Sequence, residues 1–538
     1  MHLSESEVSE REIVSRCAMT QEQDPTILST AAERTSFQSE MGRISRQSGM
    51  VFAGTIFSIL FGYIFKVYIA RVLGAEALGI YALGMTIVGF LGIFNALGLP
   101  ESAVRFVSMY SAAKRFAALR SLLWNGTWIL LASNLVFAAI LLEVGPGIAA
   151  HFYHSAQLAR YLPLFALIMI TGALNSFFGK VLAGYKELGR RTVITGFIAN
   201  PLTMAIAVVL IALGGGLWGY LAAQIASAVL VMGMLVAMVW RITPVAARSF
   251  DWNRLSIESK VWSFSAAMFS VGLMEFGISQ TDRIALGYYR GVHEVGIYSV
   301  AAAVVVYETI ILQSVNQIFA PVISDLHTRG DYVLLSRLFQ TLTKWMLGLT
   351  FPLAITVIVF ARPIMQMFGR DFYAGWPILV VGTLGQLVNC GVGSVGFLLL
   401  MSGNQRRLIR VQAVMAVTMI GLCVILVPRW GAWGAALAAA ITNVGTNVWN
   451  LIEVRVALKL SPYNRSFLKL LPSAGSALCM ALLVSRASWI RVSWVNPVAG
   501  LALAYAAFSV SALILGLDAD DRLIADAVWT RVCGVIGR

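Results

Sequence analysis

Apolar residues along this chain gather into long runs separated by short polar or charged segments. Runs of about 20 apolar residues recur from Val51 to Leu517, and each is long enough to cross a hydrocarbon core of about 30 Å as a helix. We place a helix boundary at each charged or Gly/Pro break. The expected spans are 51–73, 77–99, 122–144, 159–183, 192–213, 216–240, 261–288, 295–321, 340–369, 374–401, 408–428, 432–457, 470–487 and 495–517. The pattern predicts an all-α integral membrane protein with about 14 transmembrane helices.

Composition and charge agree with a membrane protein. Of the 538 residues, 58% are apolar and 12% are charged, against roughly 45–50% and 25% in soluble domains. The formal net charge is +14, but most Lys and Arg lie in the short loops, where they set orientation; nucleic acid is therefore not an expected partner. With a cytoplasmic N-terminus, the inside loops carry 22 Lys or Arg and the outside loops carry 8. This asymmetry predicts that both termini are cytoplasmic.

The parts of the chain outside the spans complete the expected organisation. Residues 1–42 are polar, mixed in charge and without the basic-then-apolar order of a signal peptide, so we expect a disordered cytoplasmic tail. The five cysteines stand far apart without paired spacing, so neither a disulfide framework nor a zinc site is predicted. The expected units after the tail are a six-helix lobe at 43–250, a second at 251–460, helices 13 and 14 at 461–517, and a cytoplasmic tail at 518–538.

Three short segments repeat along the chain in the same order. Residues 74–81 (GAEALGIY) match 291–298 (GVHEVGIY) at an offset of 217, and 216–219 (GLWG) match 431–434 (GAWG) at an offset of 215. A weaker match links LAG, ending at Gly184, with MSG, ending at Gly403. A nearly constant offset indicates an internal repeat. Because six spans bring the chain back to the same side, the repeat predicts two parallel six-helix units around a central cavity, as in transporters with alternating access.

Several of these segments resemble a known family. RVLGAEALGIY at 71–81, QTDRIALG at 280–287, NQIFAP at 316–321 and VPRWGAWG at 427–434 resemble the O-antigen, capsule and exopolysaccharide flippases of the multidrug/oligosaccharidyl-lipid/polysaccharide exporter superfamily. The resemblance spans about 43–517. It implies a protein of the bacterial inner membrane that flips a polyprenyl-diphosphate-linked oligosaccharide, surrounded by membrane lipids and working with polysaccharide polymerase and export proteins.

Two relatives within the superfamily remain alternatives. The drug-extruding branch typically ends at twelve helices, whereas this chain adds two more expected spans. The lipid II flippases have an acidic motif after the first span, and here that place holds Leu78-Gly-Ile-Tyr81. Both departures favour the polysaccharide branch over a multidrug or organic-cation antiporter and over a lipid II flippase.

Ionisable residues inside the spans are the first candidates for function, because each costs a few kcal/mol at mid-bilayer unless it is paired or faces water. Lys66 plus the offset of 217 gives Arg283, so the two cations are related by the repeat. Facing each other across the cavity, they would hold a diphosphate; alternatively, both snorkel to the membrane interface. Arg71 is a third candidate for substrate binding, although it lies nearer the helix end, where snorkelling is favoured.

Two carboxylates form the second candidate group. Glu275 and Asp282 are seven residues apart and therefore share one face of a helix. They would take up a proton or a sodium ion and couple transport to its gradient, or they pair with a basic residue, hydroxyl or amide as structural groups. Glu308 is a weaker candidate of the same kind. Amide side chains in the spans, among them Asn175, Gln386, Asn389 and Asn443, bind sugar hydroxyls or tie helices together.

Motifs for enzymatic chemistry are absent from the sequence. It has no GxxxxGK[ST] and no convincing Ser/His/Asp set, so we expect neither an enzyme nor a cofactor. His151 and His154 have helical spacing but no acidic third ligand nearby, so no metal site is predicted. A membrane glycosyltransferase or O-antigen polymerase usually has a large outer loop, and the longest loop here has about 20 residues. The sequence as a whole predicts a transporter.

Overall fold

The computed structural model describes residues 25–248, 257–486 and 495–516, together with Asp518 and Asp521. Within these residues the regular structure is helical and no strand occurs. The long helices are α2 (Pro25–Ala96), α3 (Leu99–Ala112), α4 (Phe116–Gly147), α5 (Ala156–Gly184), α7 (Ala199–Leu210), α8 (Gly216–Ile242), α9 (Ser259–Arg290), α10 (Val292–Tyr307), α11 (Ile310–Arg329), α12 (Tyr332–Val359), α14 (Trp376–Val392), α16 (Gln405–Trp430), α17 (Ala432–Leu458), α18 (Leu470–Arg486) and α19 (Val495–Ile514). The all-α prediction is confirmed.

Short elements connect these helices. They are η1 (Ile148–Phe152), α6 (Leu188–Thr192), η2 (Val193–Ile198), η3 (Ile211–Gly215), η4 (Val245–Ala247), α13 (Ala361–Met367), η5 (Asp371–Gly375), α15 (Val395–Met401) and η6 (Arg465–Lys469). Helix α2 begins at Pro25, inside the stretch expected as an N-terminal tail. Residues 1–24 and 522–538 of the two expected tails lie outside the described residues.

Apolar helices of membrane-spanning length dominate the fold. Ten segments of the described chain are long and apolar enough to cross a membrane, or eleven if the bent pair Val292–Tyr307 and Ile310–Asn316 forms one span. The segment Leu188–Ile242 has 55 residues, which as one straight helix would reach about 80 Å, far beyond the hydrocarbon core. It is interrupted at Gly214 and Gly216, where φ is positive. The membrane class is confirmed, and the count of fourteen stays a prediction.

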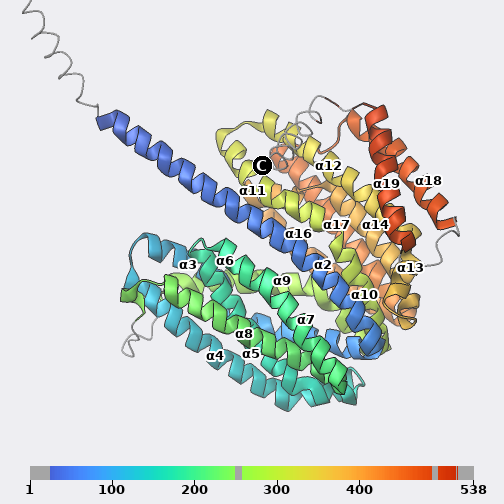
Figure 1. Cartoon of the computed structure of the whole chain (residues 1–538), viewed down its shortest axis with the longest axis horizontal. Helices are drawn as coiled ribbons and strands as arrows, with labels where there is room; N and C mark the ends of the chain where they lie inside the picture. Colours follow the sequence, from blue (N-terminus) through green and yellow to red (C-terminus); the bar gives the residue numbers. More distant parts are fainter. Residues whose placement is uncertain (1–24, 249–256, 487–494, 517, 519–520, 522–538) are drawn as a thin grey trace, which may run out of the picture.

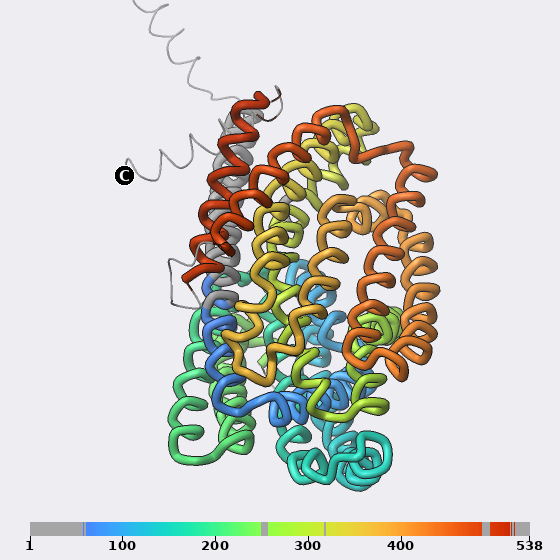
Figure 2. Tube along the Cα trace, turned by 90° about the vertical axis from the view of Figure 1, so that its right-hand side faces the viewer, coloured from blue at the N-terminus to red at the C-terminus, as the bar shows by residue number. Residues whose placement is uncertain are grey.

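Two groups of helices lie on opposite sides of α2. Figure 1 shows α4, α5, α7 and α8 on one side of this long helix and α12, α14, α17, α18 and α19 on the other. Figure 2 shows the same separation from the side, with the green helices at one end of the molecule and the orange and red helices at the other. The chain therefore builds one bundle from its first half and another from its second half.

Each group of helices has its own apolar core, and a third core joins them. Buried residues of α3, α4, α5 and α8 form one cluster and those of α11, α12, α15 and α17 form another. The joining cluster contains Leu83 of α2, Phe165 of α5, Tyr298 of α10 and Met365 of α13. Within a membrane such cores are stabilised by close van der Waals packing between helices. The two halves are therefore held together where α2 and α10 meet.

Two glycine pairs of the repeat share their backbone conformation, whereas the weaker pair does not, because φ is positive at Gly403 and not at Gly184. Gly74 has φ 77° and ψ 177°, and Gly291 has φ 85° and ψ −178°. Gly216 has φ 50° and ψ −135°, and Gly431 has φ 55° and ψ −133°. A positive φ is strained for residues with a Cβ, so glycine is needed at each turn. The matching angles confirm the internal repeat.

The helices α2 and α10 approach each other through a second pair of glycines. A Cβ added to Gly79 would lie 1.9 Å from the carbonyl oxygen of Val292, and one added to Gly296 would lie 1.9 Å from that of Ala75. Val292 is the repeat equivalent of Ala75, so the two contacts are reciprocal. The pseudo-twofold axis of the repeat therefore runs between α2 and α10.

Candidate functional site

A large cavity lies within the second half of the chain. Its volume is about 1210 Å³, and its walls come from α9, α10, α14, α16 and α17, with Arg105 of α3 at its edge. Apolar side chains of α9 and α16 line it together with polar ones. The polar lining residues away from α9 and α10 include Gln386, Gln405, Gln412, Asn443 and Thr446. The cavity thus combines hydrogen-bonding amides with an apolar wall.

Helix α9 supplies the charged part of the wall. Glu275, Asp282 and Arg283 all line the cavity, as the spacing of seven residues predicted for the two carboxylates. The Glu275 side chain is exposed and makes no hydrogen bond or ion pair within the described part of the chain. Its carboxylate is therefore available to a cation or to a hydroxyl group in the cavity.

Asp282 is the most buried of these groups and joins α9 to α10. Its side chain is 7% exposed. Its Oδ2 accepts a hydrogen bond of 2.5 Å from the Tyr298 hydroxyl, and its Oδ1 accepts one of 2.7 Å from the backbone N–H of Arg283. Both oxygens are thus engaged, which gives Asp282 a structural task in this conformation.

Arg283 combines one satisfied and one unsatisfied donor. Its NH1 group donates to Gln280 Oε1 at 2.5 Å, and the Thr86 hydroxyl donates to the same oxygen at 3.3 Å. The buried Nε has no hydrogen-bond partner among the described residues. A buried donor without a partner costs about 1–3 kcal/mol, so the guanidinium is incompletely paired in this conformation.

Lys66 lies close to Arg283 but outside the cavity wall. The two charges lie near enough to interact, whereas the repeat predicted that they face each other across the cavity. The Lys66 side chain is half-buried on α2 and has no hydrogen bond or ion pair in the described part of the chain. Lys66 is not among the described residues that line the cavity. Of these two cations, Arg283 is therefore the one that the described cavity wall contains.

Arg71 lies away from the cavity. Its Nε donates to the carbonyl oxygen of Met367 at 2.6 Å, which links the end of the first span to α13. The Arg71 side chain is exposed. The structure thus brings Arg283, Glu275 and Asp282 to one cavity and places Arg71 at a separate helix contact.

The amide residues divide between the two expected tasks. Gln386 and Asn443 line the cavity, and Asn389 donates to Gln386 Oε1 at 2.9 Å. Asn175 donates to the carbonyl oxygen of Ala228 at 2.9 Å and so ties α5 to α8. Sequence reasoning did not separate these tasks, because the rotation of each helix decides which side chains face the cavity.

Two residues of the site escaped the sequence analysis. Arg105 is one of the 22 basic residues that the sequence places in the inside loops. In the structure its guanidinium lies 4.9 Å from the centre of the Phe264 ring, and both residues line the cavity. Tyr298 counted only as part of the repeated GIY motif, whereas its hydroxyl holds Asp282. The repeated motif could have indicated this bond, because a tyrosine buried at a helix contact needs a hydrogen-bond partner for its hydroxyl.

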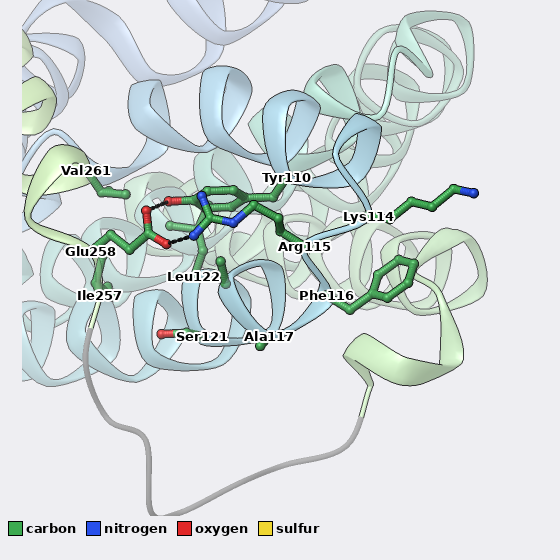
Figure 3. A pocket seen from close by; sticks show the side chains of 11 residues that line it. Tyr110, Lys114, Arg115, Phe116, Ala117, Ser121, Leu122, Ile257, Glu258 and Val261 are labelled. Atoms are coloured by element: carbon green, nitrogen blue, oxygen red, sulfur yellow. Dashed lines mark hydrogen bonds and ion pairs between the residues drawn. The ribbon is translucent and has the colours of Figure 1, made fainter.

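A second, smaller hollow lies where the α3–α4 connection meets the start of α9. Its volume is about 500 Å³. In Figure 3 the Glu258 carboxylate points at Tyr110 and Arg115, while Lys114 extends away. The Tyr110 hydroxyl donates to Glu258 Oε2 at 2.9 Å and Arg115 NH2 donates to Oε1 at 2.5 Å. Burial, followed by the bond to Glu258, raises the pKa of Tyr110 to about 12, so its hydroxyl stays a donor. These bonds join the two halves at this end.

Comparisons with known proteins agree with this architecture. The profile of a family described as "Polysaccharide biosynthesis protein" matches residues 50–374. A search of curated proteins finds no match to the chain.

Solved structures share the fold at low sequence identity. Lipid II flippase MurJ in an inward closed conformation is 16% identical with a TM-score of 0.69, over 85% of this chain and 97% of that chain. An inward-facing multidrug resistance MATE family transporter of the MOP superfamily is 14% identical with a TM-score of 0.63, over 75% and 94%. A mutant of the MATE transporter VcmN from Vibrio cholerae is 14% identical with a TM-score of 0.57, over 79% and 98%. With the family profile matching more than half of its length, this chain belongs to the polysaccharide biosynthesis protein family.

Proposed function

We propose that this protein flips a polyprenyl-diphosphate-linked oligosaccharide across the bacterial inner membrane by alternating access of its two halves. The observation that carries the proposal is the Arg283 guanidinium, with its buried and unpaired Nε, in the wall of a polar cavity of about 1210 Å³. Membership of a polysaccharide biosynthesis family supports a glycan substrate.

The size and lining of the cavity support an oligosaccharide headgroup. Pockets for drug-sized ligands have volumes of about 300–1,000 Å³, and this cavity is larger. Gln386, Gln405, Gln412 and Asn443 present amide donors and acceptors to its interior, which match sugar hydroxyl groups. The apolar wall of α9 and α16 would face the less polar sides of the sugar rings.

The charges near α9 support an anionic linkage. Arginine binds phosphate oxygens in a bidentate manner, and such bonds are about twice as strong as neutral ones. Arg283 supplies the donors, and Lys66 behind it raises the positive potential at the same place. The diphosphate would bind at this point while the prenyl chain stays in the lipid. The chain acts in this scheme as a transporter and not as an enzyme, with both termini in the cytoplasm and with polymerase and export proteins consuming the flipped product.

Lipid analysis of a deletion strain tests the proposed function. We expect polyprenyl-diphosphate oligosaccharide to accumulate, by mass spectrometry of lipid extracts, while surface polysaccharide is lost. Complementation with Arg283→Ala or Lys66→Ala should fail to restore surface glycan, whereas the matched variant Arg71→Lys should restore it. Normal glycan export by the Lys66→Ala/Arg283→Ala double variant, at wild-type protein level, would refute the cationic site.

A second function is favoured by one observation. The exposed Glu275 carboxylate in the cavity wall would suit an organic cation, and the fold is shared with MATE transporters. If the protein is a multidrug antiporter, we expect the deletion strain to become more susceptible to cationic drugs while its lipid intermediates stay unchanged. The MurJ fold gives a lipid II flippase as a third outcome, in which lipid II itself accumulates.

A further inference from the structure

Glu308 lies at the bend between α10 and α11. The two helices meet there at 44°, and the Glu308 side chain is only 1% exposed. Val305, one helical turn earlier, and Gly382, next to Thr383, both line the large cavity. The carboxyl group therefore lies directly behind the cavity wall, at the point where that wall bends.

The contacts of this carboxyl group leave one oxygen without a partner. The Thr383 hydroxyl donates to Glu308 Oε1 at 2.7 Å, whereas the buried Oε2 has no hydrogen-bond partner among the described residues. An unpaired buried charge costs several kcal/mol. A protonated carboxyl avoids that cost and keeps the bond from Thr383, because its carbonyl oxygen still accepts. A proton on Oε2 removes the unpaired charge and needs no further ligands.

The groups around Glu308 supply no compensating charge. Helix α14 presents the buried Cys390 thiol, and α12 presents Thr350 beside that thiol. On α10 itself, the ring of Tyr307 lies against Tyr63 of α2. The charged pair of α9 is engaged elsewhere, since Asp282 bonds Tyr298 and Arg283 bonds Gln280. No described basic side chain forms an ion pair with Glu308.

We propose that Glu308 is the proton-binding site that couples transport to a proton gradient. In the conformation described here Oε2 carries a proton, taken from water while the cavity faces one side of the membrane. When the cavity faces the other side and the α10–α11 bend opens toward it, the O–H bond breaks and the proton passes to water on that second side, leaving the carboxylate hydrated. The use of this cycle in transport rests on the proposed function, whereas the binding of the proton does not.

Infrared difference spectroscopy tests proton binding on the full chain in lipid nanodiscs, without any substrate. Stepping the buffer from acidic to alkaline should remove the C=O band of a protonated carboxylic acid in the wild type. The band should be lost in Glu308→Gln and retained in the matched control Glu76→Gln, whose side chain is exposed on α2. An identical band change in the wild type and in Glu308→Gln would overturn the proposal.

Glycan export in a complemented deletion strain tests the coupling. We expect Glu308→Gln, which copies the protonated state, to reach the membrane at wild-type level and to lose most export, and Glu308→Asp to keep a part of it. Full export by Glu308→Gln would overturn coupling even if the infrared band is present. If the wild type shows the band but the deletion strain exports normally, the proposed function fails and the proton site stands.

Discussion

The two halves of this protein share a backbone and differ in chemistry. Gly74 and Gly291 have matching backbone angles, and Tyr81 and Tyr298 occupy equivalent places in the repeat. The Tyr298 hydroxyl donates to the buried Asp282 carboxylate, whereas the Tyr81 hydroxyl accepts a bond of 3.0 Å from the Gln224 amide. With the offset of 217, the residue equivalent to Asp282 in the first copy of the repeat is Phe65, and the residue equivalent to Glu308 is Leu91. The repeat thus supplies a symmetric scaffold, and the carboxyl chemistry belongs to the second half alone.

The surroundings of the equivalent helices α4 and α12 differ as well. Helices α18 and α19 pack on α12. In the most apolar stretch of α12 56% of the residues are buried, whereas in that of α4 28% are buried. Helix α12 contains the buried Lys344, which pairs with Asp521 at 2.6 Å and Asp518 at 3.1 Å. Helix α4 has no charged residue between Arg120 and Glu143. The last two helices therefore cover one half and leave the other open to lipid.

Filling the glycine contact on the symmetry axis should have the largest effect. In Gly79→Ala and Gly296→Ala the new Cβ would overlap a carbonyl oxygen of the facing helix. We expect the free energy of unfolding to fall by at least about 3 kcal/mol, which is at the upper end for overpacked cores. Thermal unfolding of the purified protein measures this change. Gly92→Ala, where a Cβ meets open space on the same helix, should be neutral or stabilising. Equal stability of all three variants would refute a shared close contact.

The repeat and the charged wall were predictable from sequence, and the shape of the cavity was not. The glycines and the apolar runs are local signals, so the repeat, the helical class and the shared face of Glu275 and Asp282 followed from spacing. The cavity wall depends on how α9, α10 and α17 rotate against one another, which is set by long-range packing. The offset of 217 therefore predicted that Lys66 and Arg283 are related. It did not predict that, of these two residues, only Arg283 lines the described cavity.

Removing one tyrosine hydroxyl from each half should sharpen the difference in chemistry. Tyr298→Phe leaves Asp282 Oδ2 without its donor, and hydrogen bonds to charged groups contribute about 1.5–3 kcal/mol. Tyr81→Phe removes a bond to a neutral amide, for which about 0.5–1.5 kcal/mol is typical. We expect the larger loss of thermal stability for Tyr298→Phe. Similar losses would mean that Asp282 carries no charge in the folded protein.

The attachment of α18 and α19 to the second half should depend on pH through Asp518. Lys469, then Ser466 and Lys344, hold the pKa of this carboxyl well below its usual range of about 3.9. A carboxyl group whose pKa is lowered by folding stabilises the fold at pH values above its ordinary pKa. This stabilisation is lost as the pH falls through the pKa of the folded protein. Asp518→Asn should therefore raise hydrogen exchange at the start of α18 at neutral pH, with the difference from wild type shrinking below about pH 4. A constant difference across this range would contradict the assignment.

The two ends of the contact between the halves should respond unequally to mutation. At one end α2 and α10 meet through the buried glycines, and at the other Glu258, just before α9, holds Arg115 and Tyr110. The Arg115 and Glu258 side chains are 52% and 34% exposed, and such pairs contribute about 0.2–1 kcal/mol. An exposed pair breaks at low cost, so we expect the Glu258 end to open before the glycine contact between α2 and α10 does.

Spin labels at Lys114 and Lys260, exposed on either side of the Glu258 contact, should report this opening. We expect Glu258→Ala to shift the distance distribution between the labels toward longer values, and raised salt to shift the wild type in the same direction, because an exposed ion pair is screened. Tyr110→Phe should produce a smaller shift, since the ion pair remains. An unchanged distribution in Glu258→Ala would mean that packing of α3 on α9 closes this end, as where Ser102 and Ser265 lie 2.6 Å apart. Double substitution of those serines by alanine would then be the variant that opens it.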